Sequence, residues 1–168
     1  MTPVCSIRLA RRDDAVHIAL MSRDFIESGL GWRWTPARIV ACLRDRAMNV
    51  VVAEYGKRIV GFGIMQYREL EAHLMLFGIL PQARRRGIGT VLLRWLEKVA
   101  LNAGIELVFL EARCSNAAAR EFYRMQGYRE LALLKRYYAG TEDAVRIGRD
   151  LTAAPQAVPP RGSQHADD

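Results

Sequence analysis

Apolar residues recur along the chain with two periods, which indicate two kinds of secondary structure. Alternating or valine-rich runs predict strands at Cys5–Leu9, Asn49–Tyr55, Arg58–Tyr67, Ala72–Leu80, Ile105–Glu111, Tyr128–Tyr138 and Ala144–Asp150. Apolar residues three and four positions apart predict helices from Asp14 to about Met21, Thr35 to about Arg46, Ile88 to about Asn102, and Asn116 to Met125. The chain therefore contains both strands and helices, and the two kinds of element alternate only from the helix at Ile88 to the helix that ends at Met125.

The order of these elements predicts the kind of sheet. The turn at Gly56–Lys57 and the few residues before Ala72 make three consecutive strands antiparallel. The strand at Ile105–Glu111 follows a helix, so it is expected to lie parallel to its predecessor through a right-handed crossover. The predicted fold class is α/β, with a mixed, largely antiparallel central sheet flanked by helices. Residues 1–151 form one predicted domain, and 152–168 are predicted to be a disordered tail.

A basic loop from Pro81 to Thr90 joins the fourth predicted strand to the third predicted helix. Gly87 and Gly89 let the backbone approach a ligand without an intervening Cβ. The first N–H groups of a helix have no partner within it and lie at the positive end of its dipole, so the loop favours a phosphate group. Three arginines before Gly87 add charge and bidentate donors. The alternative is an ordinary helix start beside a solvated basic run.

The spacing within this loop excludes two common phosphate-binding motifs. No lysine precedes a serine or threonine as in a P-loop, and Leu92 stands where the dinucleotide fingerprint needs its third glycine. The remaining pattern, Arg84-x-x-Gly87-x-Gly89 after a proline and before an apolar helix, resembles the acyl-CoA pyrophosphate loop of the GNAT acetyltransferase superfamily. This resemblance implies the GNAT fold and acetyl-CoA as the acetyl donor.

Composition and charge narrow the class of partner. The 25 basic and 18 acidic residues give a net charge of +7. Nucleic-acid binding is the first suspicion, but the arginines are scattered among acids and no zinc-finger, RRM or KH signature is present. No apolar run reaches the roughly 18 residues of a membrane span, and residues 1–10 lack the apolar core of a signal peptide. We therefore expect neither a nucleic-acid nor a membrane partner.

The cysteines indicate the redox compartment. Cys5, Cys42 and Cys114 are odd in number, far apart and without a C-x-x-C pair. We therefore expect neither a disulfide framework nor a metal site, and we expect a cytoplasmic location. Cys114 as an acyl-carrying nucleophile is rejected, because no histidine is nearby in the sequence.

A second group of candidate residues begins at Glu111. This residue ends a predicted strand, and Asn116 and Tyr123 are two turns apart on one face of the next helix. The three side chains can therefore converge near the glycine loop, at the carboxyl end of a parallel strand. The run from Glu111 to Asp143 resembles the GNAT branch that acetylates protein N-terminal amines, which includes the bacterial ribosomal-protein alanine N-acetyltransferases.

The resemblance implies a role for each of these side chains. Glu111 would be the general base, usually through water, and Tyr123 would protonate the departing thiolate. The implied acetyl-CoA contacts are Ile79, Arg84, Arg85, Arg86, Gly87, Ile88, Gly89, Thr90, Asn116 and Tyr123. The candidate acceptor-site residues are Trp34, Tyr137 and Tyr138. The expected reaction is acetyl transfer to a primary amine, above all to a protein N-terminus, whose α-amine loses its proton at about pH 7.7–8.0.

Alternatives remain at each position. Glu111 could be a solvent-exposed carboxylate at a strand end, and Asn116 could only cap a helix. Tyr123 and Trp34 could pack in the core, and Tyr137 and Tyr138 could be ordinary strand residues. His73 is expected to be a surface or packing residue. The acceptor could be a small amine such as a polyamine or an antibiotic, and a CoA-binding regulatory module without turnover is the alternative from another class. A monomer and a homodimer both remain open.

Overall fold

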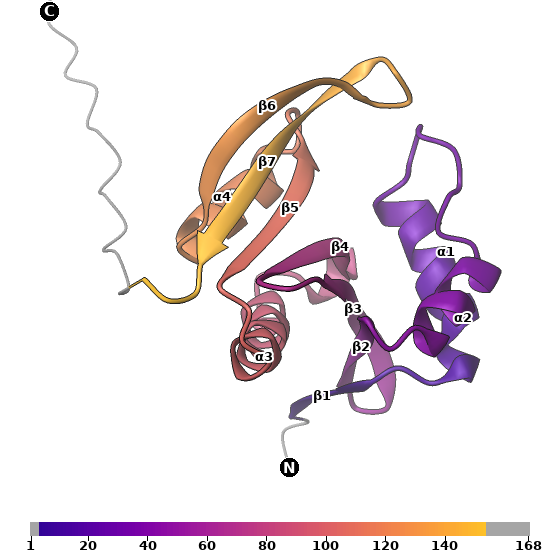
Figure 1. Cartoon of the computed structure of the whole chain (residues 1–168). Helices are drawn as coiled ribbons and strands as arrows, with labels where there is room; N and C mark the ends of the chain where they lie inside the picture. Colours follow the sequence, from indigo (N-terminus) through magenta and orange to yellow (C-terminus); the bar gives the residue numbers. More distant parts are fainter. Residues whose placement is uncertain (1–3, 154–168) are drawn as a thin grey trace, which may run out of the picture.

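The computed structural model describes residues 4–153, which form a seven-stranded sheet with helices on both faces (Figure 1). The strands are β1 (Cys5–Leu9), β2 (Met48–Tyr55), β3 (Arg58–Tyr67), β4 (Glu71–Ile79), β5 (Leu107–Arg113), β6 (Arg129–Tyr138) and β7 (Glu142–Asp150). The helices are α1 (Ala15–Phe25), α2 (Pro36–Arg44), α3 (Ile88–Asn102) and α4 (Ala117–Met125), with short 3₁₀ turns η1 (Arg12–Asp14) and η2 (Pro81–Ala83). The strand order is β1-β2-β3-β4-β5-β7-β6.

The sheet confirms the predicted fold class. Within the described residues only β4 and β5 pair in parallel, and the other five ladders are antiparallel. The predicted elements are all present, with ends shifted by a few residues; α2, for example, ends at Arg44 instead of Arg46. Most of the predicted tail, residues 154–168, lies outside the described residues. None of the helices within residues 4–153 is long and apolar enough to cross a membrane.

Two apolar clusters hold the helices against the sheet. One cluster packs α3 and α4 on one face, and the other packs α1 and α2 on the opposite face over β2, β3 and β4. The buried side of α3 is formed by Ile88, Leu92, Leu93, Leu96 and Ala100. The spacing of Val91 after Ile88 favours the same face, but Val91 is 47% exposed, because the face of α3 that meets the sheet is centred on Leu92 and Leu96.

The parallel pair β4–β5 is short. Its register ends at His73 opposite Phe109, although β4 continues to Ile79 and β5 to Arg113. A bulge in β4 between Leu74 and Leu76 bends this strand as it pairs with β3. Beyond Phe109 the two strands diverge, as Figure 1 shows. The middle of the sheet is thus open at the carboxyl ends of its parallel strands, where ligands commonly bind in α/β folds.

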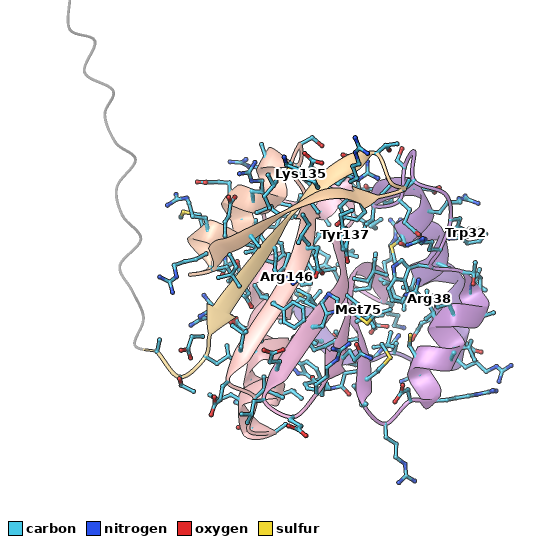
Figure 2. All side chains as sticks on the ribbon, turned by 45° about the horizontal axis from the view of Figure 1, so that its top comes forward. Trp32, Arg38, Met75, Lys135, Tyr137 and Arg146 are labelled. Atoms are coloured by element: carbon cyan, nitrogen blue, oxygen red, sulfur yellow. The ribbon has the colours of Figure 1, made fainter. Side chains whose placement is uncertain are left out.

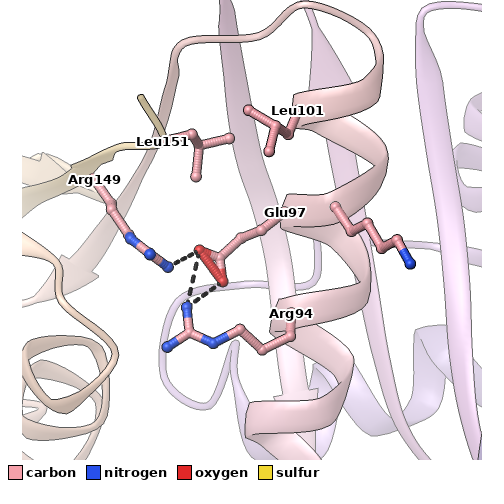
Figure 3. A pocket seen from close by; sticks show the side chains of 6 residues that line it. Arg94, Glu97, Leu101, Arg149 and Leu151 are labelled. Carbon is pink, nitrogen blue, oxygen red and sulfur yellow. Dashed lines mark hydrogen bonds and ion pairs between the residues drawn. The ribbon is translucent and has the colours of Figure 1, made fainter. Parts of the chain in front are cut away.

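Glu97 is a charged residue on the buried side of α3. It is 5% exposed and accepts hydrogen bonds from Arg94 of the same helix at 2.7 and 3.2 Å and from Arg149 of β7 at 2.5 Å (Figure 3). The contact joins α3 to the C-terminal end of the sheet. A buried carboxylate is tolerated only when its charge is compensated in this way, and removing one member leaves the others unpaired.

Glu97→Ala is therefore expected to lower the free energy of unfolding by about 3 kcal/mol, because it leaves Arg149 and Arg94 without their shared carboxylate. Urea denaturation followed by circular dichroism measures this change. Lys98→Ala is the matched control, since Lys98 is the exposed neighbour of Glu97 on α3, and it should change stability by less than about 0.5 kcal/mol. Equal losses for the two variants would show that the Glu97 ion pairs do not stabilise the fold.

Candidate active site

The basic loop ends at the first turn of α3. Gly87 is the N-cap of this helix, with φ +79°, and no side chain caps the helix there. The N–H groups of Ile88, Gly89 and Thr90 therefore have no acceptor earlier in α3 and are available to an anion. A Cβ built on Gly87 would meet no atom within 4 Å, so the space beside this N-cap is free of protein. The loop thus has the open backbone cradle that a pyrophosphate needs.

Neighbouring contacts hold the cradle in place. Arg84 donates from Nε to the carbonyl oxygen of Ile79 at 3.0 Å, so part of its guanidinium stabilises the loop itself. A Cβ on Gly89 would lie 3.3 Å from the ring of Phe122 on α4, so this glycine permits close packing of the two helices. Gln126, just after α4, donates to the hydroxyl of Thr90 at 3.0 Å. The start of α3 and the end of α4 therefore form one unit.

Tyr123 is a residue of α4, and its side chain packs towards the diverging end of β4. Its ring packs 6.2 Å from that of Phe77 on β4 and 5.1 Å from that of Phe122, measured between ring centroids. The side chain is only 6% exposed, and burial raises the pKa of its hydroxyl well above the usual value. Tyr123 is thus a protonated phenol at every physiological pH. Asn116 caps α4 through its side-chain oxygen, which accepts from the N–H of Ala119 at 3.1 Å.

Glu111 is held by two partners on the other face of the sheet. Its Oε2 lies 2.5 Å from Nε2 of His73, and its Oε1 accepts from Nη2 and Nε of Arg146 at 2.9 and 3.2 Å. The side chain of Glu111 is 6% exposed. Burial alone would raise the pKa of this carboxyl, but the hydrogen bonds from His73 and Arg146 outweigh burial and lower it. Glu111 is therefore a carboxylate at neutral pH and not a solvated strand end.

His73 and Arg146 were both missed as partners of Glu111. His73 was expected to be a surface or packing residue, but its side chain is 17% exposed, hydrogen-bonded to Glu111 and stacked on Phe109 with 4.5 Å between ring centroids. The contact follows from the register of the parallel pair, in which His73 lies opposite Phe109, two residues before Glu111. Arg146 lies directly opposite Glu111 in the β5–β7 ladder. Only the pairing of these strands brings the three together.

The segment between α1 and α2 forms one side of this region. Trp34 is 8% exposed and belongs to the core beneath α1 and α2, so its packing alternative is realised. The guanidinium of Arg38 lies over its ring at 3.7 Å. Arg113, at the end of β5, donates to the carbonyl oxygens of Ile26 and Ser28 at 3.1 and 2.8 Å. This contact fixes the segment against the carboxyl end of β5.

Tyr137 and Tyr138 form the other side, at the end of β6. Their rings meet edge to face at 4.9 Å, and Tyr137 is 46% exposed. Burial and the negative charge of Glu111 raise the pKa of Tyr137, while the cations Arg146 and Arg33 act in the opposite direction. Figure 2 shows Tyr137 and Arg146 on β6 and β7 facing the part of the molecule that carries Met75 and Arg38. Tyr137 therefore lies within electrostatic reach of Glu111 and of Arg33 in the segment between α1 and α2.

The described residues contain no cluster of metal-binding side chains. Within residues 4–153 no three His, Cys, Asp or Glu residues are grouped closely enough to hold an ion. The groups that the fold assembles are a carboxylate with an imidazole and a guanidinium, a buried phenol on the opposite face, and an open helix start. These groups can bind an anion, accept a proton and donate a proton.

The chain is similar to known acetyltransferases. The model of the "Acetyltransferase (GNAT) family" matches residues 15–128. The N-alpha-acetyltransferase of Sulfurisphaera tokodaii is 31% identical over 158 residues, which cover 86% of this chain and 92% of that protein. The [ribosomal protein bS18]-alanine N-acetyltransferase of Escherichia coli K12 is 31% identical over 148 residues, which cover 86% of this chain and 95% of that protein.

A solved structure shows the same fold. The crystal structure of Ard1 from Thermoplasma volcanium superposes with a TM-score of 0.78 and 25% identity, and the match covers 87% of this chain and 97% of that one. The family match spans more than half of the chain, and the sheet is mixed and largely antiparallel, as the resemblance implied. The chain therefore belongs to the GNAT acetyltransferase family and is an N-acetyltransferase.

Proposed function

We propose that this enzyme transfers the acetyl group of acetyl-CoA to the α-amine of a protein N-terminus. The observation that carries the proposal is the Glu111 carboxylate, held by His73 and Arg146 at the open carboxyl ends of β4 and β5. The relatives named as N-terminal acetyltransferases, from an archaeon and a bacterium, support this acceptor. Three cysteines without disulfides, Cys5, Cys42 and Cys114, support a reducing cytoplasm as the compartment.

The residues at the start of α3 fit the donor. The N–H groups of Ile88, Gly89 and Thr90, with Arg85 and Arg86 beside them, would hold the pyrophosphate of acetyl-CoA, since no protein atom fills the space at Gly87. The donor supplies an activated thioester to the reaction. Asn116 uses its side-chain oxygen as a helix cap, so only its amide nitrogen remains to contact the pantetheine arm.

Glu111 and His73 would act together on the acceptor. A carboxylate with a lowered pKa orients an ammonium well but binds the released proton weakly. The imidazole at 2.5 Å from Oε2 is the kind of side chain most often used for proton transfer near neutral pH. We infer that Glu111 holds the amine and that the proton passes to water or to Nδ1 of His73, because Nε2 already donates to Glu111. Tyr123, a neutral phenol, would donate its proton to the departing sulfur.

The acceptor class is tested with two peptides of the same sequence. One has a free N-terminal alanine and no lysine, and the other is N-terminally blocked and carries one internal lysine. Release of CoA thiol and the mass of each product should show at least tenfold faster acetylation of the free peptide, because an α-amine loses its proton about 2.5 pH units below a lysine. Faster acetylation of the blocked peptide, or activity confined to polyamines, would overturn the proposal.

A further inference from the structure

Arg146 belongs to the open face of the sheet. It lies opposite Glu111 in the β5–β7 ladder, so the two side chains point to the same face. Its neighbours Val145 and Ile147 point the other way, into the core under α3 and α4. Arg146 therefore lies beside the group that receives the acceptor amine, and Figure 2 shows it next to Tyr137 on the side facing Arg38.

Arg146 has more hydrogen-bonding capacity than Glu111 uses. Only Nε and Nη2 donate to Glu111, and both reach the same oxygen, Oε1. The outer nitrogen Nη1 has no hydrogen bond to any residue from 4 to 153, and the side chain is 40% exposed. The guanidinium carbon lies 5.5 Å from the ring centroid of Phe109, which supports the side chain from below. The Arg146 guanidinium is therefore held in position by Glu111 and Phe109, and its Nη1 edge is free to bind a group of the acceptor.

The carboxylates around this edge already have partners, whereas a second cation has none. Glu142 pairs with Arg113 and accepts from Ser115, and buried Glu27 accepts from Ser22 and from two backbone N–H groups. Arg33 forms no ion pair with the described residues, and it lies near enough to influence the Tyr137 hydroxyl, as Arg146 does. The acceptor entrance therefore offers unpaired positive charge.

We propose that Arg146 selects acceptors with an acidic side chain at the second residue, whose carboxylate binds to Nη1. The inference rests on the proposed transfer to a protein N-terminus. The nitrogen of an amine that is hydrogen-bonded to Glu111 lies about 3 Å from a carboxylate oxygen. The Arg146 guanidinium is hydrogen-bonded to the same carboxylate at a similar distance. A carboxylate on Nη1 is then roughly 6–9 Å from the amine, which suits the side chain of the second residue in an extended peptide at about 3.5 Å per residue.

The test uses three peptides that begin Ala-Glu, Ala-Gln and Ala-Lys and are otherwise identical. The wild-type enzyme should acetylate the Glu peptide with a kcat/KM about fivefold above that of the Gln peptide, mostly through KM, and the Lys peptide should be the poorest. In Arg146→Gln the Glu-to-Gln ratio should fall to about 1. This ratio is informative even though the substitution also removes a partner of Glu111, because a general loss of activity cancels between the two peptides.

Two further variants and the salt dependence complete the test. Arg146→Lys keeps the charge and should retain a preference for the Glu peptide, so it supports the proposal even if Arg146→Gln folds poorly. Arg129→Gln is the control, since Arg129 is exposed at the far end of β6, and it should keep the full wild-type ratio. The preference should also shrink as salt is raised from about 0.05 to 0.5 M, as expected for a partly exposed ion pair.

Three outcomes would overturn the inference. Equal rates for the Glu and Gln peptides, or a preference for the Lys peptide, would show that no cation selects the acceptor. A Glu preference that persists in Arg146→Gln would place the carboxylate on another residue. If no peptide with a free N-terminus is acetylated by the wild-type enzyme while a polyamine is, the proposed function fails as well, and that result is distinct from the first two.

Discussion

Replacing Glu111 with glutamine is expected to lower kcat/KM for an N-terminal peptide by about 100-fold at pH 6 and by only a few-fold at pH 9. At pH 6 about one α-amine in 50–100 is neutral, so the reaction depends on removal of the proton, whereas at pH 9 most of the amine is already neutral. Glu111 would hold the amine for this proton transfer, and loss of assisted proton transfer typically costs 10²–10⁴-fold where the transfer is needed. Initial rates of thiol release over this pH range measure the effect.

The sign of the pH dependence follows from the lowered pKa of Glu111. A carboxyl group whose pKa is lowered by folding is charged at all pH values above its unfolded value, and its contribution to stability is lost only as the pH falls below about 4. The wild-type carboxylate therefore stays charged from pH 6 to 9. A loss of wild-type activity toward pH 6 is therefore expected from protonation of the amine and not from protonation of Glu111.

Two variants control for charge and separate the two proton transfers. Glu130→Gln makes the same change on exposed β6, where Glu130 pairs with Arg120, and it should keep the wild-type rate at every pH. Tyr123→Phe should lower kcat by about tenfold or more with little change in acetyl-CoA affinity, because only the proton offered to the leaving sulfur is lost. If Glu111→Gln shows the same fractional loss at pH 6 and pH 9, Glu111 does not assist amine deprotonation.

The features predictable from the sequence are those that a local pattern determines. The alternating and helical periods predicted every strand and α-helix of the described residues, although not the 3₁₀ turns η1 and η2, and the loop from Pro81 to Thr90 revealed the start of α3 through its glycines. Glu111 and Tyr123 became candidates through their positions at a strand end and on the next helix, and the resemblance to GNAT enzymes implied their roles. Local patterns were thus sufficient for the fold and for naming candidate residues that lie on single elements.

The partners of Glu111 depend on pairing between distant strands. His73 reaches Glu111 because β4 and β5 are parallel and in one register, and Arg146 reaches it because β7 inserts between β5 and β6. The bulge between Leu74 and Leu76 changes which β4 side chains face each side of the sheet, and nothing in the strand pattern predicts it. The same limit applies to Trp34, whose burial depends on how α1 and α2 pack.

Gly87→Leu is expected to weaken binding of acetyl-CoA on the order of 100-fold. A Cβ at this position meets no atom within 4 Å, so we expect the leucine side chain to extend into the space through which a pyrophosphate would approach the start of α3. Each hydrogen bond to a charged phosphate oxygen contributes about 1.5 kcal/mol or more, so the loss of two would reduce affinity by this factor. Isothermal titration of the purified variant with acetyl-CoA measures the change.

Gly104 provides a matched control at the other end of α3. Its φ is +82°, close to the +79° of Gly87, and a Cβ there also meets no atom within 4 Å. Gly104→Leu should therefore impose a similar backbone strain, about 1–2 kcal/mol in thermal or urea unfolding, while leaving acetyl-CoA affinity unchanged. The difference in acetyl-CoA affinity between the two variants therefore separates the effect of blocking the pyrophosphate from the effect of backbone strain at a helix end. Unchanged affinity in Gly87→Leu, with both variants folded, would mean that the donor does not bind at this helix start.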